Sequence, residues 1–456
     1  MLKKISIFFM LFAMIFSTMS FQTRVYAASD YTNGVSVSGA TATIWFKSNV
    51  NTSWVDVHYT INSGTQQNFR MTYNSSTGKY EQNITVAKGD VIKYSFTYNN
   101  GTPAYDTQSF SYTVGSNDNG GGNTNPGTSS SIYSIKASDI PSATGNGVLS
   151  LKLMNGTNGK YADNQVYWGI IGKIPGTDTW AYLDLNGNLV PISTALNDAS
   201  GHLTKNGQNY ANIYHKISDA GWVNLPKITS GRMFISMGSP CYIKTYDNGF
   251  AGPDINNPSD PNINVYFDFI EFTVDNGGYH GNVTRVDQFG FPMQHRLINK
   301  AGNYDKTVGE RESETRDGIF EEYKNEVPTE FKSLATLEAP YRIVCPISGP
   351  FKEGGAYANY FAGYSNISTR DILLGIGGAS TNVVCAALNR HVYENQSNWN
   401  KVSEYYKAAP ANYYAKFWHD HSIDGLAYGF CYDDVNGQAA YVEVGDPKGV
   451  IVRAGW

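Results

Sequence analysis

Apolar and polar residues alternate in several short stretches of the first quarter of the chain. The stretches 41–47, 54–61 and 91–98 each place apolar side chains at every second position, which is the period of a half-buried β-strand. Asn, Ser and Gly residues typical of turns separate them. The pattern predicts a small all-β sandwich module over residues 30–114.

The second half of the chain begins in the same way and then changes its period. Strand-and-turn units open the region that starts at residue 132, and a helical spacing of apolar residues follows later. Strands first and helices afterwards indicate helices added to a β core. The predicted helical stretches are 310–337 with an interruption at Pro328, 380–391, 399–407 and 411–419.

Two further segments set the expected domain boundaries. Residues 115–131 are rich in Gly, Asn, Ser and Thr, and such a composition predicts a flexible linker. Residues 1–27 combine a basic start, a short apolar run and a small residue at Ala27, which is typical of a secretory signal peptide. The expected order is signal peptide, module, linker and a larger domain over residues 132–456, in a secreted, extracellular and monomeric protein.

Composition and charge narrow the class of partner. The whole chain has 34 basic and 39 acidic residues, and residues 1–27 hold three of the basic ones and no acid. The remaining formal charge of about −8 argues against nucleic acid or an anionic membrane as partner. The 33 Tyr residues suit stacking on the rings of a neutral sugar polymer, although an all-β protein also uses Tyr in its strands.

Cysteines and acidic motifs give little reason to expect a metal or another cofactor. Export makes one or two disulfide bonds plausible, and the three possible complete pairings stay open. No CxxC pair is present, so we expect no zinc site of that kind. The His-Asp-His run at 419–421 fits capping or packing better than metal binding. The four cysteines are Cys241, Cys345, Cys385 and Cys431.

Two carboxylic residues stand out in the segment 264–292. This segment reads as two alternating strands joined by a glycine-containing loop. If the chain reverses around Tyr279, Glu271 and Asp287 face each other across the hairpin. Hydrolysis of a glycosidic bond uses two carboxyl groups on opposite sides of the bond. A salt bridge of Arg285 with either acid is the alternative interpretation.

The neighbours of the two acids predict different roles for them. Glu271 shares a strand face with Phe267 and Phe269, and an apolar surrounding favours a protonated carboxyl group that acts as general acid. Asp287 lies among polar residues, which favours an ionised base. Directly opposed side chains would have Cβ atoms about 5 Å apart, whereas an inverting enzyme separates its carboxyl groups by about 6.5–9.5 Å.

Two tryptophans of the predicted module are candidates for sugar binding. Trp45 and Trp54 fall on the polar faces of their strands, where an exposed indole ring usually marks an interaction surface. Coverage of these rings by loops or by the linker is the alternative.

The motifs of both regions resemble known families. The module resembles carbohydrate-binding module family 56, a β-1,3-glucan binder, in WVDVHYTI (54–61), GDVIKYSFTYNNG (89–101) and PAYDTQSFSYTV (103–114). Residues 132–456 resemble glycoside hydrolase family 64, the thaumatin-like β-1,3-glucanases, in three other motifs. These are DFIEFTVD (268–275), VTRVDQFGFP (283–292) and YGFCYDDVNGQ (428–438).

The resemblance implies a fold, a reaction and site residues. The implied fold is a thaumatin-like β-barrel or sandwich plus a mixed α/β domain with a wide groove between them. The implied reaction is hydrolysis of β-1,3-glucan with inversion, releasing laminari-oligosaccharides, with Glu271 as general acid and Asp287 as general base. The implied sugar-contacting residues are Thr273, Thr284, Asp260, Asp433, Asp434 and, in the loop after the acid, Tyr279 or His280.

One alternative function belongs to another class. A thaumatin-like protein that binds glucan without cutting it, or that acts against fungi, has the same general features. The presence of both Glu271 and Asp287 favours the enzyme. A β-1,4-glucanase or chitinase is disfavoured because both regions resemble families that act on β-1,3-glucan.

Overall fold

The chain forms two compact units, which divide at residue 125. The predicted signal peptide and nearly all of the predicted linker lie outside the described residues, and no helix among the described residues is long and apolar enough to cross a membrane. The computed structural model describes residues 31–38, 40–62, 64–87, 89–107, 110–114, 131–247 and 249–456.

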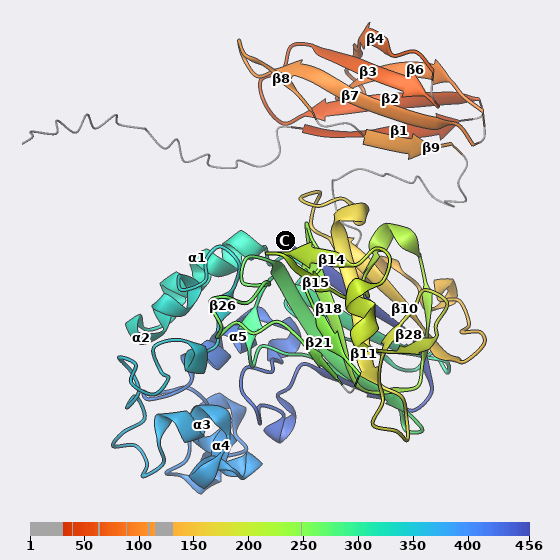
Figure 1. The fold of residues 1–456 in the computed structure, drawn as a ribbon. Coiled ribbons are helices and arrows are strands. Elements are labelled where there is room, and N and C mark those ends of the chain that lie inside the picture. The colour runs from red at the N-terminus through yellow and green to blue at the C-terminus, as the bar shows by residue number, and fades with distance from the viewer. Residues whose placement is uncertain are drawn as a thin grey trace, which may run out of the picture. The chain divides into compact units, whose positions relative to one another are not determined.

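The front unit is a sandwich of two antiparallel sheets (Figure 1). Alternate residues of both sheets, among them Ile44, Phe46, Val57 and Phe96, form one buried core, as the alternating pattern predicts. One sheet has the order β1 (Tyr31–Ser38), β2 (Thr41–Ser48), β6 (Lys79–Thr85) and β5 (Thr72–Asn74). The other has the order β4 (Gln67–Arg70), β3 (Val55–Ile61), β7 (Val91–Asn99) and β8 (Ala104–Asp106), with β9 (Phe110–Thr113) also paired to β7.

Two larger sheets form the β part of the second unit. The five-stranded sheet has the order β17 (Val223–Pro226), β10 (Gly147–Gly156), β28 (Pro447–Gly455), β24 (Met293–Asn299) and β25 (Asp305–Gly309). The eight-stranded sheet runs β13 (Leu189–Pro191), β12 (Trp180–Leu183), β11 (Val166–Lys173), β18 (Ile228–Met237), β21 (Tyr266–Asp275), β22 (Gly278–Val283) and β27 (Tyr441–Val444), and β16 (His215–Lys216) pairs with β11.

A shared apolar core holds these two sheets face to face. Leu151 and Val452 of the smaller sheet belong to the same buried cluster as Ile235 and Ile270 of the larger one. The outer face of the larger sheet is covered in part by a second cluster, to which Phe267 and Phe269 of β21 belong. Phe267 and Phe269 therefore share one face of β21 and Ile270 the other, as the sequence predicts.

Helices gather in a separate lobe of the second unit, beside the sheets (Figure 1). Its core includes Phe289, Tyr323, Phe417 and Trp418. The short pair β23 (Gln288–Phe289) and β26 (Ile343–Val344) connects this lobe to the segment after β22. Its helices are α1 (Arg316–Glu326), α2 (Thr329–Lys332), α3 (Thr369–Leu374), α4 (Asn382–Asn389) and α5 (Tyr413–His421).

Three of the four predicted helical stretches contain helices, which are shorter than predicted within 310–337 and 380–391 and shifted by two residues at 411–419. The side chain of Thr315 caps α1 by accepting a hydrogen bond from the backbone N–H of Gly318, and the interruption at Pro328 falls between α1 and α2. The predicted helix 399–407 is wrong. Only a 3₁₀ turn at Val402–Glu404 forms there, because the flanking residues Lys401 and Tyr405 adopt an extended backbone, and the following Tyr406 has a left-handed φ of 59° that a right-handed helix does not tolerate. The short helix α3 was not predicted.

All four cysteines are free in the structure. The Sγ atoms of Cys385 and Cys431 lie 3.8 Å apart, too far for a disulfide bond. No disulfide bond is therefore present among the described residues, and the expectation of one or two disulfides is not met.

Candidate active site

The hairpin of β21 and β22 reverses at its Asn-Gly pair, before Tyr279. Asp275 pairs with Gly278, so the tight turn consists of Asn276 and Gly277, a sequence typical of two-residue hairpins. Glu271 consequently lies opposite Asn282. The prediction that Glu271 and Asp287 face each other across a hairpin centred on Tyr279 is therefore wrong.

Asp287 lies beyond the end of the hairpin. The strand β22 ends at Val283, and Asp287 occupies a bend before β23. The second of the two strands predicted in segment 264–292 therefore ends before Asp287. The carbonyl of Asp287 accepts a hydrogen bond of 3.1 Å from the backbone N–H of Cys345, which fixes this bend against the helical lobe.

A row of polar side chains crosses four neighbouring strands at the level of Glu271. Arg232 of β18 is the partner of Glu271 in the register of the sheet, and Tyr441 of β27 is the partner of Asn282. The order Arg232, Glu271, Asn282, Tyr441 thus runs across the outer face of the sheet. The Oδ1 atom of Asn282 is buried and has no hydrogen-bond partner among the described residues.

The outer face of β21 changes from covered to open along the strand. Phe267 and Phe269 are buried under the second cluster, whereas Glu271 and Thr273, which follow on the same face, are half-buried. One strand thereby supplies both the anchor in the core and the polar residues that remain accessible.

A groove of about 660 Å³ occupies this open part of the sheet. Glu271 and Thr273 lie in its wall, together with the aromatic pair Trp180 and Phe250, whose rings meet edge to face at a centroid distance of 5.1 Å. The other lining residues are Ser230, Gly231, Arg232, Gly249, Phe272, His280, Gly281, Asn282 and Tyr441. Accessible aromatic rings beside a carboxylate suit a sugar chain.

Arg232 is the cationic partner of Glu271. Its Nη2 atom donates to Oε1 of Glu271 at 2.5 Å, and its guanidinium lies 4.2 Å from the ring centroid of Phe269. Both members of the ion pair are more than one-third exposed. Packing on Phe269 therefore directs the guanidinium toward the carboxylate at the edge of the groove.

The charge of Asp287 responds to the same two residues. Asp287 keeps accessible surface, yet the protein packed around it raises the pKa of its carboxyl group by desolvation. The positive charge of Arg232 lowers this pKa, and the negative charge of Glu271 raises it. The two acids and Arg232 therefore form one electrostatic group, although Asp287 is not among the residues that line the groove. The surroundings predicted for the two acids are wrong: Glu271 is 40% exposed and paired with Arg232 instead of enclosed by apolar side chains, and desolvation raises the pKa of Asp287.

A buried ion network holds the segment that carries Asp287. Arg285 donates to Asp268 at 3.0 Å and to Glu310 at 2.6 and 2.8 Å, and all three side chains are buried. Desolvation raises the pKa of Asp268 to about 6, while Arg285 opposes the rise. Arg285 therefore pairs with structural acids, and the alternative of a salt bridge with Glu271 or Asp287 is wrong.

Some of the other predicted sugar-contacting residues line the groove, and others are buried in the core. Thr273 and His280 line the groove and face each other across β21 and β22. Tyr279 is 1% exposed, stacks on Phe272 and shares a hydrogen bond of 2.8 Å with His295. The prediction of a sugar contact therefore fails for Tyr279, because its ring belongs to the core, and His280 is the accessible alternative.

Asp433 also has a structural role. Its buried carboxylate accepts hydrogen bonds from Arg390 at 2.9 Å and from the backbone N–H of Gly429 at 2.9 Å, and it lies 3.0 Å from Nε2 of His419. A contact with sugar is excluded in this conformation, because the carboxylate has no accessible surface. The neighbouring Asp434 is exposed.

Thr284 and Asp260 lie outside the groove as well. Thr284 is buried, and its hydroxyl accepts a hydrogen bond from the backbone N–H of Val286, the residue before Asp287. Asp260 accepts hydrogen bonds from the backbone N–H groups of Asp254 and Asn262, as an acid in a turn does. Neither residue lines the groove.

Several residues that line the groove were not predicted from the sequence. Arg232, Asn282, Tyr441, Trp180 and Phe250 come from different strands, and only the order of strands in the sheet brings them together. The Asn276-Gly277 pair is the one local signal that fixes the register and thereby places Asn282 opposite Glu271.

The two predicted tryptophans of the module lie on opposite outer faces of its sandwich. Trp45 belongs to β2 in one sheet, and Trp54 immediately precedes β3 in the other. The Nζ atom of Lys79 lies 3.6 Å from the ring centroid of Trp45, and the guanidinium of Arg70 lies 4.5 Å from that of Trp54. Both rings are half-buried, and they cannot serve one shared platform.

Ligands suited to a metal ion do not gather in the groove. Where the structure is described, Glu314, Glu322 and His421 form a group with the spacing of metal ligands, and none of them lines the groove.

Comparison with known proteins assigns a different family to each of the two units of the chain. Residues 147–368 and 374–454 match the model of glycoside hydrolase family 64, described as β-1,3-glucanase, and residues 33–107 match the model of carbohydrate-binding module family 56. A curated glucan endo-1,3-β-glucosidase of Cellulosimicrobium cellulans is 24% identical over an alignment of 298 residues, and the match covers 51% of this chain and 53% of that protein. The matched part thus spans about half the length of this relative.

Two solved structures resemble the chain over longer stretches. A family 64 laminaripentaose-producing β-1,3-glucanase from Paenibacillus barengoltzii, complexed with laminarihexaose, is 66% identical, covers 94% of this chain and 100% of its own, and gives a TM-score of 0.72. A family 64 β-1,3-glucanase domain from Clostridium beijerinckii is 38% identical to this chain. The match covers 69% of this chain and 100% of that domain, with a TM-score of 0.65. The chain therefore belongs to glycoside hydrolase family 64, the β-1,3-glucanase family, and carries a family 56 carbohydrate-binding module in front of its catalytic region.

Proposed function

We propose that this chain is a secreted, monomeric endo-β-1,3-glucanase that hydrolyses β-1,3-glucan with inversion and releases laminari-oligosaccharides such as laminaripentaose. The observation that carries the proposal is the electrostatic group of Glu271, Arg232 and Asp287 at a groove with aromatic walls. The 66% identity to a laminaripentaose-producing relative supports the product.

In this mechanism Glu271 donates a proton to the glycosidic oxygen. The ion pair with Arg232 then stabilises the carboxylate that remains. Asp287 accepts a proton from a water molecule that attacks the anomeric carbon from the other side of the sugar ring. Its position beyond the end of β22, away from the residue opposite Glu271, supports a separation that leaves room for this water.

The partly aromatic lining of the groove supports a polysaccharide as the substrate. Trp180 and Phe250 offer apolar ring surface, and Thr273, His280 and Asn282 offer polar groups for hydroxyls. We propose curdlan, laminarin and fungal wall glucan as substrates, with the module holding the enzyme on solid glucan. Neither a metal nor an organic cofactor takes part in the proposed steps.

Location and finer fold class are part of the same proposal. The signal-like residues 1–27 support export. The face-to-face sheets of the second unit and the helical lobe beside them support a thaumatin-like sandwich joined to a mixed α/β part.

Two measurements on the full chain test the function. Reducing sugar released from laminarin and curdlan reports hydrolysis, and binding without release supports the non-catalytic alternative. Proton NMR during the first turnovers reports the anomer. The α anomer is expected first from a β-linked substrate, whereas the β anomer as first product means retention and a different role for Asp287.

A further inference from the structure

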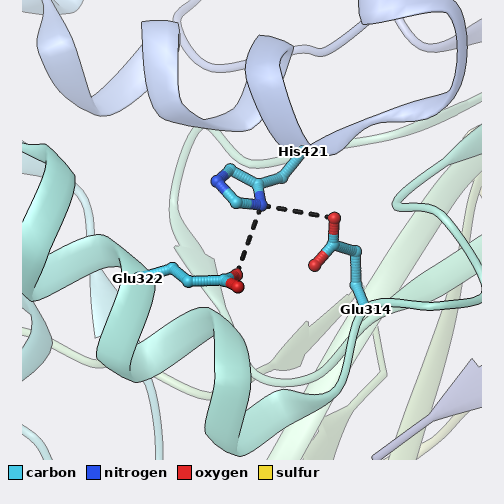
Figure 2. Close-up of side chains that lie close together, drawn as sticks. All are labelled: Glu314, Glu322 and His421. Carbon is cyan, nitrogen blue, oxygen red and sulfur yellow. Dashed lines mark hydrogen bonds and ion pairs between the residues drawn. The ribbon is translucent and has the colours of Figure 1, made fainter.

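A cluster of ionisable side chains lies away from the groove, where the end of α5 meets α1. Figure 2 shows the imidazole of His421, from the end of α5, between the carboxylates of Glu314 and Glu322. Glu322 belongs to α1, and Glu314 immediately precedes the N-cap of that helix. His421 is 8% exposed, so its imidazole is largely withdrawn from water.

The distances in this cluster are those of atoms that share one metal ion. Nδ1 of His421 lies 3.3 Å from Oε1 of Glu314 and 3.6 Å from Oε2 of Glu322. All three ligand atoms lie within 4.8 Å of one another. Two ligand atoms bound at about 2.1 Å in a tetrahedral site are about 3.4 Å apart, whereas a good N–H···O hydrogen bond is shorter, about 2.9 Å.

Among the described residues, one ligand atom has only the ion pair with His421 as a polar contact. The side chain of Glu322 is 46% exposed as a whole, but its Oε2 atom is covered by the protein, points toward the imidazole (Figure 2) and makes no hydrogen bond within the described part of the chain. A buried carboxylate oxygen without a hydrogen bond is costly. A cation placed between Glu314, Glu322 and His421 would remove this cost.

A fourth residue orients the imidazole. Nε2 of His421 lies 3.2 Å from Oε2 of Glu326, so a proton on Nε2 is held by Glu326 and Nδ1 is left to face the other two acids. This is the arrangement in which a carboxylate fixes a metal-binding histidine from behind.

The local charge also matches a divalent ion. Three carboxylates surround the imidazole, and Arg311 pairs with one of them, Glu314, at 3.1 Å. With the imidazole neutral, as a metal ligand is, three carboxylates against one guanidinium leave a formal charge of −2. One divalent cation balances it.

We propose that Glu314, Glu322 and His421 bind one divalent transition-metal cation of the Zn²⁺ type, with Glu326 as the residue that positions His421. The nitrogen ligand favours such ions over Mg²⁺ and Ca²⁺, which prefer oxygen ligands alone. The ion would join α1 to α5 and stabilise the helical lobe without entering the chemistry at Glu271.

The test uses the full chain after treatment with EDTA and dialysis. Titration calorimetry with ZnCl₂ should show one equivalent bound, and Tm should rise with Zn²⁺ concentration because the ion binds the folded state. MgCl₂ and CaCl₂ at the same concentration should leave Tm unchanged. Absence of Zn²⁺ binding to the unaltered chain overturns the proposal.

Three variants assign the ion to this cluster. Glu322→Gln and His421→Gln should abolish the Zn²⁺-dependent rise in Tm, and Glu326→Gln should weaken binding by about 10–100-fold, as expected for a positioning residue. Glu321→Gln is the matched control, since Glu321 lies on the same helix and pairs with Lys324 at 2.6 Å. Circular dichroism checks that each variant folds.

Two outcomes decide the assignment. Binding of one equivalent that is lost in both Glu322→Gln and His421→Gln but kept in Glu321→Gln supports the site. Binding that survives in either ligand variant means that Zn²⁺ binds elsewhere on the chain and overturns the proposal. Hydrolysis of laminarin by Glu322→Gln should equal that of the unaltered chain, which separates this test from that of the proposed function.

Discussion

Glu271 lies directly opposite Asn282 across β21 and β22, and Asp287 follows only after β22 has ended at Val283. Opposed residues of a hairpin have Cβ atoms about 5 Å apart, which is too close for a water molecule between two carboxyl groups. Placing Asn282 opposite Glu271 removes that conflict, since Asp287 approaches from a bend outside the hairpin. The register of one tight turn therefore decides that an amide, and not a second carboxylate, lies opposite Glu271.

The first prediction concerns the two acids. Glu271→Gln and Asp287→Asn should each lower kcat on laminarin by about 10²–10⁴-fold, because each change removes one half of the proton transfer. Tm should change little, since both side chains are accessible and both substitutions preserve shape. Activity like that of the unaltered enzyme in either variant would falsify the assignment of that residue.

Arg232 gives a second prediction, on pH dependence. The base must be ionised, so kcat/KM rises as pH passes upward through the pKa of Asp287. Desolvation raises this pKa and Arg232 lowers it. Arg232→Met should therefore raise the pKa of Asp287 further and move the acidic limb of the kcat/KM profile to higher pH.

A matched control for Arg232 is available outside the electrostatic group. Lys227 is exposed and donates to Asn276 at the hairpin turn. Lys227→Met removes one positive charge on the same side of the hairpin and should leave the acidic limb in place. An equal shift in both variants would mean that the limb reports overall charge and not the contact between Arg232 and Asp287.

Local periodicity predicted which residues of β21 share a face, because that property depends on neighbours in sequence. Phe267 and Phe269 are on one face and Ile270 on the other, as expected. The register was mispredicted, although Asn276-Gly277 is a local signal for a two-residue turn. No comparable signal exists for Arg232, because its contact with Glu271 depends on β18 being the neighbour of β21 in the sheet.

The burial of Asp433 was also not predictable from the sequence. Asp433 lies in the motif YGFCYDDVNGQ, and the family resemblance implies a sugar contact for it. The structure buries it because Arg390 of the segment after α4 and His419 of α5 converge on it. Burial of this kind depends on contacts between distant segments, which a single sequence does not contain.

The third prediction concerns the stability of that buried pair. Burial raises the pKa of Asp433, but His419, Arg390 and the N–H of Gly429 outweigh burial, and the pKa lies below its ordinary value. The resulting stabilisation is present above the unfolded pKa of about 3.9 and is lost as pH falls through the folded pKa. Asp433→Asn should therefore cost about 3–5 kcal/mol at pH 7, since it leaves the buried guanidinium of Arg390 without its ionic partner.

Urea denaturation at several pH values measures this effect. The difference in the free energy of unfolding between the unaltered chain and Asp433→Asn should be largest near pH 7 and shrink below pH 4. Asp434→Asn is the control, because Asp434 is exposed and its substitution should change stability by no more than about 0.5 kcal/mol. A difference that stays constant down to pH 3 contradicts the ionic role of Asp433.

The last prediction concerns the module and its two tryptophans. Deleting residues 28–131 should lower activity on insoluble curdlan and leave activity on short soluble oligosaccharides nearly unchanged, because a tethered module raises the local concentration of solid substrate. The groove supports this expectation, since all of its lining residues belong to the second unit.

Trp45 and Trp54 lie on opposite faces, so they separate two possible binding surfaces. We expect Trp54→Ala to weaken retention of the isolated module on curdlan by about 1 kcal/mol, roughly fivefold. Trp45→Ala should have little effect. It controls for the loss of an indole ring, since each of the two rings packs under a cationic side chain. The reverse ranking assigns binding to the sheet of β2. Equal retention in both variants, together with sedimentation of the unaltered module, means that neither tryptophan forms the glucan platform.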